Sequence, residues 1–71
     1  MLLVQLRKTL CPSTYVEISR PVFRDPRRPS EMIYEGEAQH MPIMYDERRI
    51  DKIGAGVNRF GSPEIMIKLE Y

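Results

Sequence analysis

Residues 49–71, RIDKIGAGVNRFGSPEIMIKLEY, contain two segments in which apolar residues fall on every second position, separated by a turn sequence. This period places the apolar side chains on one face of a β-strand. The inward positions are Ile53, Ala55 and Val57 in the first segment and Ile65, Ile67, Leu69 and Tyr71 in the second. Residues 58–63 hold the Asn, Gly and Pro that turns favour, so the two strands are predicted to form an antiparallel hairpin.

The N-terminal half predicts a helix followed by two strands. Leucines at positions 3, 6 and 10 share one helical face, and Pro12 disfavours helical geometry before it, which predicts a helix over residues 2–10. Residues 14–19 alternate as a half-buried strand, and residues 32–39 resume the strand pattern. Gly36 suggests a bulge or a close backbone approach there. The Pro-led segment 42–48 predicts one or two helical turns.

Together these elements predict an α+β fold, with a short N-terminal helix packed on a small, mainly antiparallel sheet of about four strands. We expect one domain over residues 1–71, with a Pro/Arg-rich loop at 20–30. The predicted core consists of Leu3, Leu6, Val16, Ile18, Tyr34, Ile53, Val57, Ile65, Ile67 and Leu69. A chain of 71 residues buries only about 60% of its unfolded surface, so we also expect a homo-oligomer, most simply a dimer.

Composition narrows the classes of function. One Cys cannot form an intramolecular disulfide, and one Cys with one His cannot close a structural zinc site. We expect Cys11 to be buried and inert, as suits a reducing cytoplasm. The N-terminus has no signal-peptide pattern, and no apolar run is long enough to span a bilayer. A formal net charge of +1 argues against a dedicated nucleic-acid binder. We expect no cofactor and no metal.

The loop at 20–30 is the best candidate for binding, because it holds four arginines and three prolines. Guanidinium groups recognise phosphates and carboxylates through paired hydrogen bonds, and prolines lower the entropy lost when a loop becomes ordered. The alternative is a loop that only increases solubility. The candidate binding cations are Arg20, Arg24, Arg27 and Arg28, with Arg48 and Arg49 as a second basic pair.

Two shorter patterns are weaker candidates for a site. Gly54-Ala55-Gly56 lacks the third glycine and the following helix of a dinucleotide-binding loop, so Gly54 and Gly56 indicate either a bulge or a place where a ligand approaches the backbone. Glu35 and Glu37 share one strand face, as an acid/base pair or as part of a solvated face. His40 is the only His that could activate a nucleophile, and no catalytic pattern surrounds it. We therefore expect no enzymatic activity.

The order of these segments resembles small proteins of phages and prophages of gut Firmicutes. The resemblance rests on Leu-Arg in the helix, Pro-x-Thr-x-Val-x-Ile (12–18), Ile-Tyr-Glu-Gly-Glu-Ala (33–38), the Pro-led turn, Arg-x-Ile-x-x-Ile (48–53) and Ile-x-Ile-x-Leu (65–69). It covers nearly the whole chain except the arginine loop, which looks like an insertion. The resemblance implies an accessory phage protein in the host cytoplasm that counters a host defence.

Two functions are consistent with that implication. The first is a protein that binds and antagonises or regulates a host protein, which suits a small near-neutral domain with an unpaired edge strand. The alternative is an oligomeric sponge for a nucleotide signal or another anionic small molecule, which suits the arginines and the glycine pair.

Overall fold

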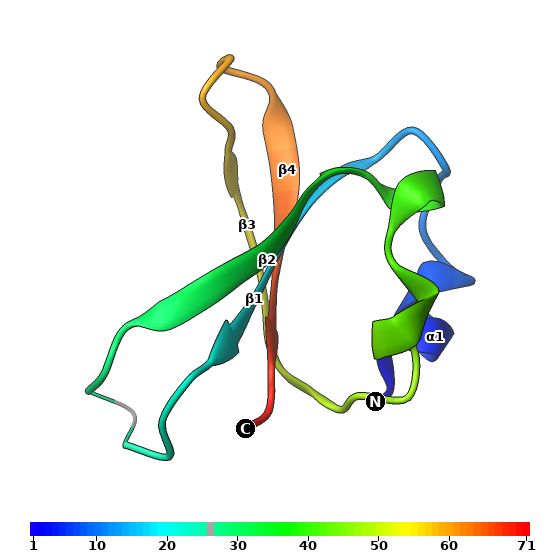
Figure 1. Ribbon diagram of the computed structural model, residues 1–71. Coiled ribbons are helices and arrows are strands. Elements are labelled where there is room, and N and C mark those ends of the chain that lie inside the picture. Colours follow the sequence, from blue (N-terminus) through cyan, green and yellow to red (C-terminus); the bar gives the residue numbers. More distant parts are fainter. Residues whose placement is uncertain (26) are drawn as a thin grey trace.

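The computed structural model describes residues 1–25 and 27–71, so Pro26 of the predicted loop lies outside the described residues. The chain forms a short α-helix, four β-strands and two 3-10 turns (Figure 1). In chain order these are α1 (Leu3–Arg7), β1 (Tyr15–Pro21), β2 (Ser30–Glu37), η1 (Ala38–His40), η2 (Ile43–Tyr45), β3 (Ile50–Val57) and β4 (Pro63–Leu69).

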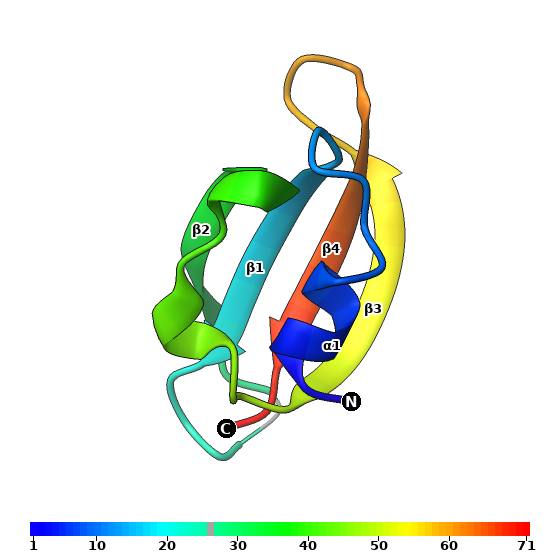
Figure 2. The ribbon, with the colours of Figure 1, turned by 90° about the vertical axis from the view of Figure 1, so that its right-hand side faces the viewer.

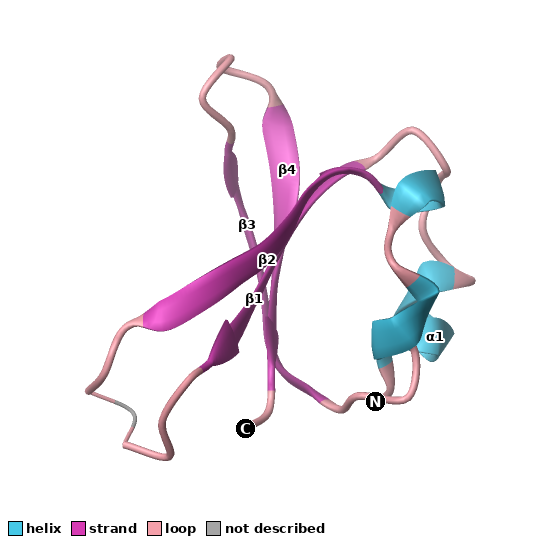
Figure 3. Cartoon of the chain, viewed as in Figure 1, coloured by secondary structure: helices cyan, strands magenta, loops and turns pink. Residues whose placement is uncertain are grey.

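The four strands form one open sheet in the order β2-β1-β4-β3 (Figure 2). The outer pairs, β1–β2 and β3–β4, are antiparallel hairpins, whereas the central pair β1–β4 is parallel. The predicted α+β class with about four mainly antiparallel strands is therefore confirmed. The parallel pair arises because the chain leaves β2 at one edge, crosses one face through η1 and η2, and enters β3 at the other edge (Figures 2 and 3).

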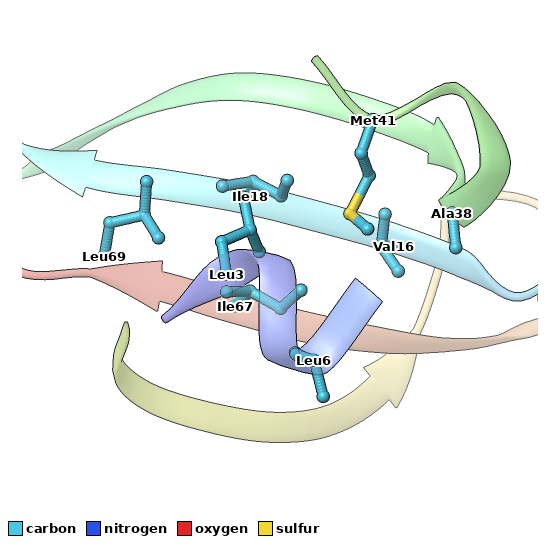
Figure 4. Packing of buried hydrophobic residues seen from close by; sticks show 8 residues of the cluster. All are labelled: Leu3, Leu6, Val16, Ile18, Ala38, Met41, Ile67 and Leu69. Carbon is cyan, nitrogen blue, oxygen red and sulfur yellow. The ribbon is translucent and has the colours of Figure 1, made fainter. Parts of the chain in front are cut away.

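All helical segments lie on one face of the sheet, and the core lies beneath them (Figures 3 and 4). Its members are Leu3, Leu6, Val16, Ile18, Ala38, Met41, Ile67 and Leu69. Six of the predicted core residues are in this set, and Tyr34 and Ile65 are partly buried against it. The prediction was wrong for Ile53 and Val57, which are 47% and 68% exposed. The face of Ile53 was correct, because it pairs with Ile67, but the short helical layer leaves this edge strand uncovered.

Arg7 holds the helical layer together. Its Nε and Nη2 atoms both donate hydrogen bonds to Asp46 Oδ1, at 3.0 and 2.6 Å, and its Nη1 donates to the Met41 carbonyl at 2.9 Å. Because these partners belong to the segment that joins β2 to β3, the contact fixes that crossing segment against α1. Hydrogen bonds between a guanidinium and a carboxylate are about twice as strong as neutral ones.

Three local expectations had different outcomes. The helix ends at Arg7 rather than at residue 10. The irregularity in the β1–β2 pairing lies between Ile18 and Ser19 and not at Gly36. At Gly36 it is a side chain and not a backbone that comes close, since an added Cβ would lie 2.7 Å from the Tyr34 hydroxyl. Cys11 is exposed, so the prediction of a buried thiol was wrong, because the loop after α1 lies outside the core.

No helix in the described part of the chain is long and apolar enough to cross a membrane.

Candidate functional site

The arginine loop connects β1 to β2 at one end of the sheet, but it is shorter than the predicted 20–30, because Arg20 and Pro21 belong to β1 and Ser30 begins β2. Its arginines and Arg20 lie beside other side chains. Arg20 Nε lies 3.4 Å from Glu31 Oε2 on the paired strand. Arg27 Nε lies 3.3 Å from Asp25 Oδ1, although the Arg27 side chain remains largely exposed. The Arg28 guanidinium lies over the Phe23 ring, 5.1 Å from its centroid.

Three of the predicted arginines converge on the C-terminal residue, Tyr71. The guanidinium of Arg24 lies 5.3 Å from the centroid of the Tyr71 ring. Arg20 and Arg48 line an open surface depression of about 250 Å³ together with Tyr71. Arg48 Nη2 also donates a hydrogen bond of 2.9 Å to the Glu70 carbonyl. We call Arg20, Arg24, Arg48 and Tyr71 the arginine-tyrosine cluster.

The arginine-tyrosine cluster also contains acidic groups. Glu31 lines the same depression as Arg20 and pairs with it, and a neighbouring depression beside Arg24 is lined by Asp51, Lys68 and Glu70. Charge around the cluster is therefore nearly balanced, which weakens the long-range attraction of an anion. The remaining attraction of the cluster for a ligand comes from the aromatic ring and from hydrogen-bond donors at short range.

The other predicted binding residues lie elsewhere. Arg49 is exposed, and its backbone carbonyl accepts a hydrogen bond from Glu70 N–H at 2.8 Å. Gly54 and Gly56 lie in β3, opposite Met66 and Glu64 of β4. An added Cβ at Gly54 would meet no atom within 4 Å, whereas at Gly56 it would lie 3.0 Å from Met66 Sδ. The pairing irregularity in β3 lies between Ile50 and Lys52, so neither glycine is the bulge.

The face of the sheet opposite the helical layer carries mostly polar side chains. By strand alternation and register it presents Tyr15, Glu17, Ser19, Met32, Glu35, Glu37, Lys52, Gly54, Gly56, Glu64, Met66 and Lys68. We call this surface the open face. A shallow depression of about 340 Å³ lies on it, lined in part by Gly54, Met66 and Lys68. Sheets with antiparallel hairpins tolerate one solvated face of this kind.

One feature of the open face escaped the sequence prediction. Glu17 and Glu35 are directly paired across β1 and β2, and Glu64 comes from β4 on the other side of β1. We call these three carboxylates the acidic strip. Glu64 is only 5% exposed, and its Oε2 atom is buried without a hydrogen-bond partner. Arg59 reaches the strip from the β3–β4 turn, with Nη2 2.7 Å from Glu35 Oε1.

The electrostatics of the acidic strip follow from this crowding. Burial raises the pKa of the Glu64 carboxyl above its ordinary value, and the neighbouring carboxyl groups of Glu17 and Glu35 raise it further. Burial and the neighbouring Glu35 likewise raise the pKa of Tyr15. Of the ion pairs in the part of the chain that the structure describes, only Arg59–Glu35 involves the strip.

β3 and β2 are the two edge strands of the sheet, and β3 is the more exposed of them. Of its eight residues only Ile50 and Gly56 are partly covered, and the rest are exposed. The segment Ile53–Val57 contains no charge and no proline. β2 forms the opposite edge, but it carries three glutamates and an irregular pairing with β1. Charges and bulges protect an edge from pairing. β3 has both at its start, where its pairing is irregular between Ile50 and Lys52, but Ile53–Val57 has neither and is the more accessible edge.

The residues that were considered for catalysis are His40, Glu35 and Glu37. His40 is largely exposed at the end of η1, with Nε2 3.9 Å from Glu37 Oε1. Glu35 and Glu37 do share one face of β2, as predicted, but Glu35 is engaged by Arg59. Across residues 1–25 and 27–71, no three His, Cys, Asp or Glu side chains are placed to hold a metal ion.

No family model matches the sequence, and comparisons with curated proteins and with solved structures gave no match.

Proposed function

We propose that this chain is a non-enzymatic accessory protein that binds a partner protein by adding a strand of the partner to the outer edge of β3. The observation that carries this proposal is the exposure of β3, an eight-residue strand at the end of the sheet. The outer backbone N–H and C=O groups of an edge strand are ready to pair with another strand, and such pairing is a recurrent mode of peptide recognition.

The side chains of β3 support this mode of binding. Gly54, Ala55 and Gly56 leave little bulk beside the backbone, so a second backbone can approach closely. Ile53 and Val57 are exposed apolar side chains that a partner strand can cover. The irregularity at Asp51 ends the regular pairing at one end, so the usable edge is Lys52–Val57.

The expected partner is a host protein, and the expected consequence is its antagonism or regulation. This part of the proposal rests on the resemblance to small phage proteins, which also makes the host cytoplasm the expected location. A host-defence protein is the partner that the resemblance favours. The same edge can pair with a second copy of the chain, which would give the expected dimer.

The alternative function is the binding of a nucleotide or another anionic small molecule at the arginine-tyrosine cluster. The observation that favours it is the position of the Tyr71 ring between Arg24 and the depression lined by Arg20 and Arg48. An aromatic ring can stack on a base while guanidinium groups contact phosphate. A thermal-shift screen with cyclic and linear nucleotides tests it, because a ligand of the folded state raises the melting temperature with its concentration. Arg49→Ser, outside the cluster, is the control for Arg24→Ser.

The test of strand addition compares two double variants with equal changes of charge. Ile53→Lys/Val57→Lys places charges on the β3 edge, whereas Ile43→Lys/Met44→Lys places them on η2, where both side chains are 78% exposed. Immobilised wild type and variants are used to capture proteins from host lysate, with quantification by mass spectrometry. We expect a partner that is retained by the wild type and the η2 variant and lost by the β3 variant.

Hydrogen exchange then locates the contact. With the captured partner purified and added back, amides of residues 52–57 should exchange more slowly in the complex, because new inter-strand hydrogen bonds protect them. Protection elsewhere with unchanged β3 exchange would overturn the proposal. Equal capture by all three proteins would overturn it as well.

A further inference from the structure

The acidic strip contains more negative charge than the fold neutralises. Glu17 and Glu35 face each other directly across two strands, an arrangement that destabilises a sheet. Glu64 adds a third carboxyl from β4, and Arg59 is the one cation paired with the strip among the described ion pairs. With all three carboxyls ionised, the strip keeps an excess of two negative charges.

Glu64 is the second, separate observation. A carboxyl group that is 95% buried normally has its oxygens hydrogen-bonded, because burial of an unpaired polar atom is costly. Glu64 is 5% exposed and its Oε2 has no hydrogen-bond partner. On β3 the residue opposite it is Gly56, which has no side chain to contribute. The buried oxygen therefore has unused acceptor capacity within the strip.

The spacing of the strip selects the kind of cation. In the described part of the chain, no three His, Cys, Asp or Glu side chains, those of the strip included, are placed to hold a metal ion. A guanidinium group is larger, and it presents five N–H donors in a planar fork that can contact separated carboxylates. Arg59 already makes such a contact at Glu35, 2.7 Å from Nη2 to Oε1, so the strip is shown to accept a guanidinium at one end.

We propose that the acidic strip is a binding site for an arginine side chain of a partner protein, which donates hydrogen bonds to Glu17 and Glu64 beside the internal Arg59–Glu35 pair. The site lies on the open face and not on the outer edge of β3, so this proposal is independent of strand addition. Arg59 comes from a turn and is largely exposed, and its pairing with Glu35 reduces the negative charge that attracts an incoming arginine.

Proton release accompanies binding in this arrangement. The groups that face the Glu64 carboxyl are Glu17 from β1, Glu35 from β2, and, beside Glu35, Tyr15 and Arg59. The raised pKa of Glu64 means that the free protein keeps this carboxyl protonated to a higher pH than usual. An arginine favours the ionised form, so its affinity should increase as the pH rises through that titration.

The test uses the full chain, labelled with ¹⁵N, and a peptide with one arginine, acetyl-Gly-Arg-Gly-amide. The control peptide carries citrulline, which has nearly the same shape and no charge. We expect the arginine peptide to shift backbone amides around residues 17, 35 and 64 in a saturable way, and the citrulline peptide to cause no such shifts. Equal shifts from both peptides, or shifts spread over the whole surface, would overturn the proposal.

Variants assign the contact to individual groups. Glu64→Gln should weaken binding by about tenfold or more, because it removes one charge-assisted hydrogen bond, and its residual affinity should lack the pH dependence that the titration of Glu64 causes. Glu17→Gln provides the same test in a less buried position if Glu64→Gln does not fold. Glu47→Gln removes an exposed acid elsewhere and should leave affinity unchanged.

Removing Arg59, which pairs with Glu35 in the free protein, gives the most specific test of the site. Arg59→Gln should strengthen binding of the arginine peptide severalfold, because it frees Glu35. Arg27→Gln removes one positive charge from the other end of the sheet and should have no effect, since Arg27 pairs with Asp25. Equal strengthening by both variants would indicate general electrostatic attraction and would refute a defined site.

Discussion

Truncation of Ile67 to alanine tests the packing of the sheet most directly. Ile67 is 1% exposed, and it lies in β4 between Ile18 of β1 and Ile53 of β3. Removing a buried isoleucine side chain costs about 2 to 5 kcal/mol of unfolding free energy, through lost burial and the cavity that remains. Domains have about 0.05 to 0.15 kcal/mol of stability per residue, so this loss is a large share of the total for a chain of this size. The melting temperature should fall by about 10 °C or more.

Ile53→Ala is the matched control for this truncation. Ile53 is the cross-strand partner of Ile67 and lies on the same face, but it is 47% exposed. The same chemical change should therefore cost less than about 1 kcal/mol. Urea denaturation followed by circular dichroism measures both values under identical conditions. Equal losses in the two variants, or a melting temperature of Ile67→Ala within a degree or two of the wild type, would show that the assigned inner face is wrong.

Three further outcomes follow from exposure and charge. Replacing Arg24, Arg27 and Arg28 together with serine should change stability by no more than about 1 kcal/mol, because exposed cation–π contacts are weak, while any nucleotide-induced rise in melting temperature should be lost. The wild type should lose stability as pH rises from the ordinary Glu value of 4.5 through the raised folded-state pKa of Glu64, whereas Glu64→Gln should not, so thermal scans of the two should diverge toward neutral pH. Cys11 should react with a thiol reagent in the native protein as fast as in urea, and a strong native protection would contradict its exposure.

The local elements were predictable from sequence because their signals are local. Alternation of apolar residues identified β1, β3 and β4, a resumed strand pattern identified β2, and the turn residues at 58–63 identified the β3–β4 hairpin. The arginine loop was recognised as a connection because prolines disfavour the interior of a strand, although Pro21 is the last residue of β1. The convergence of Arg20, Arg24 and Arg48 on Tyr71 was not predicted, since it depends on how the ends of distant strands meet.

The parallel pairing of β1 and β4 is the feature that sequence patterns could not supply. It places Glu17 beside Met66, and thus near Glu64, although these residues are separated by most of the chain. Alternation did indicate that Glu17 and Glu64 point away from the apolar side chains of their strands. Alternation does not give the strand order. Without the strand order, Glu17, Glu35 and Glu64 could not be recognised as neighbours.

Alternation also identifies an inner face without showing how much of it is covered. The helical layer packs over β1 and β4, so Ile53 and Val57 of β3 point toward the inner side and still remain exposed. Because the helical segments are too short to cover β3 as well, the β3 edge stays accessible. No second layer covers the opposite face of the sheet in the described part of the chain, so that face is solvated. Charges are expected on a solvated face, but the burial of Glu64 is not. A glutamine at position 64 would keep the shape and remove the cost of placing a third carboxyl beside Glu17 and Glu35. Groups that reduce the stability of the free fold are concentrated where a protein binds something, and at this position a partner's guanidinium would convert the repulsion into attraction.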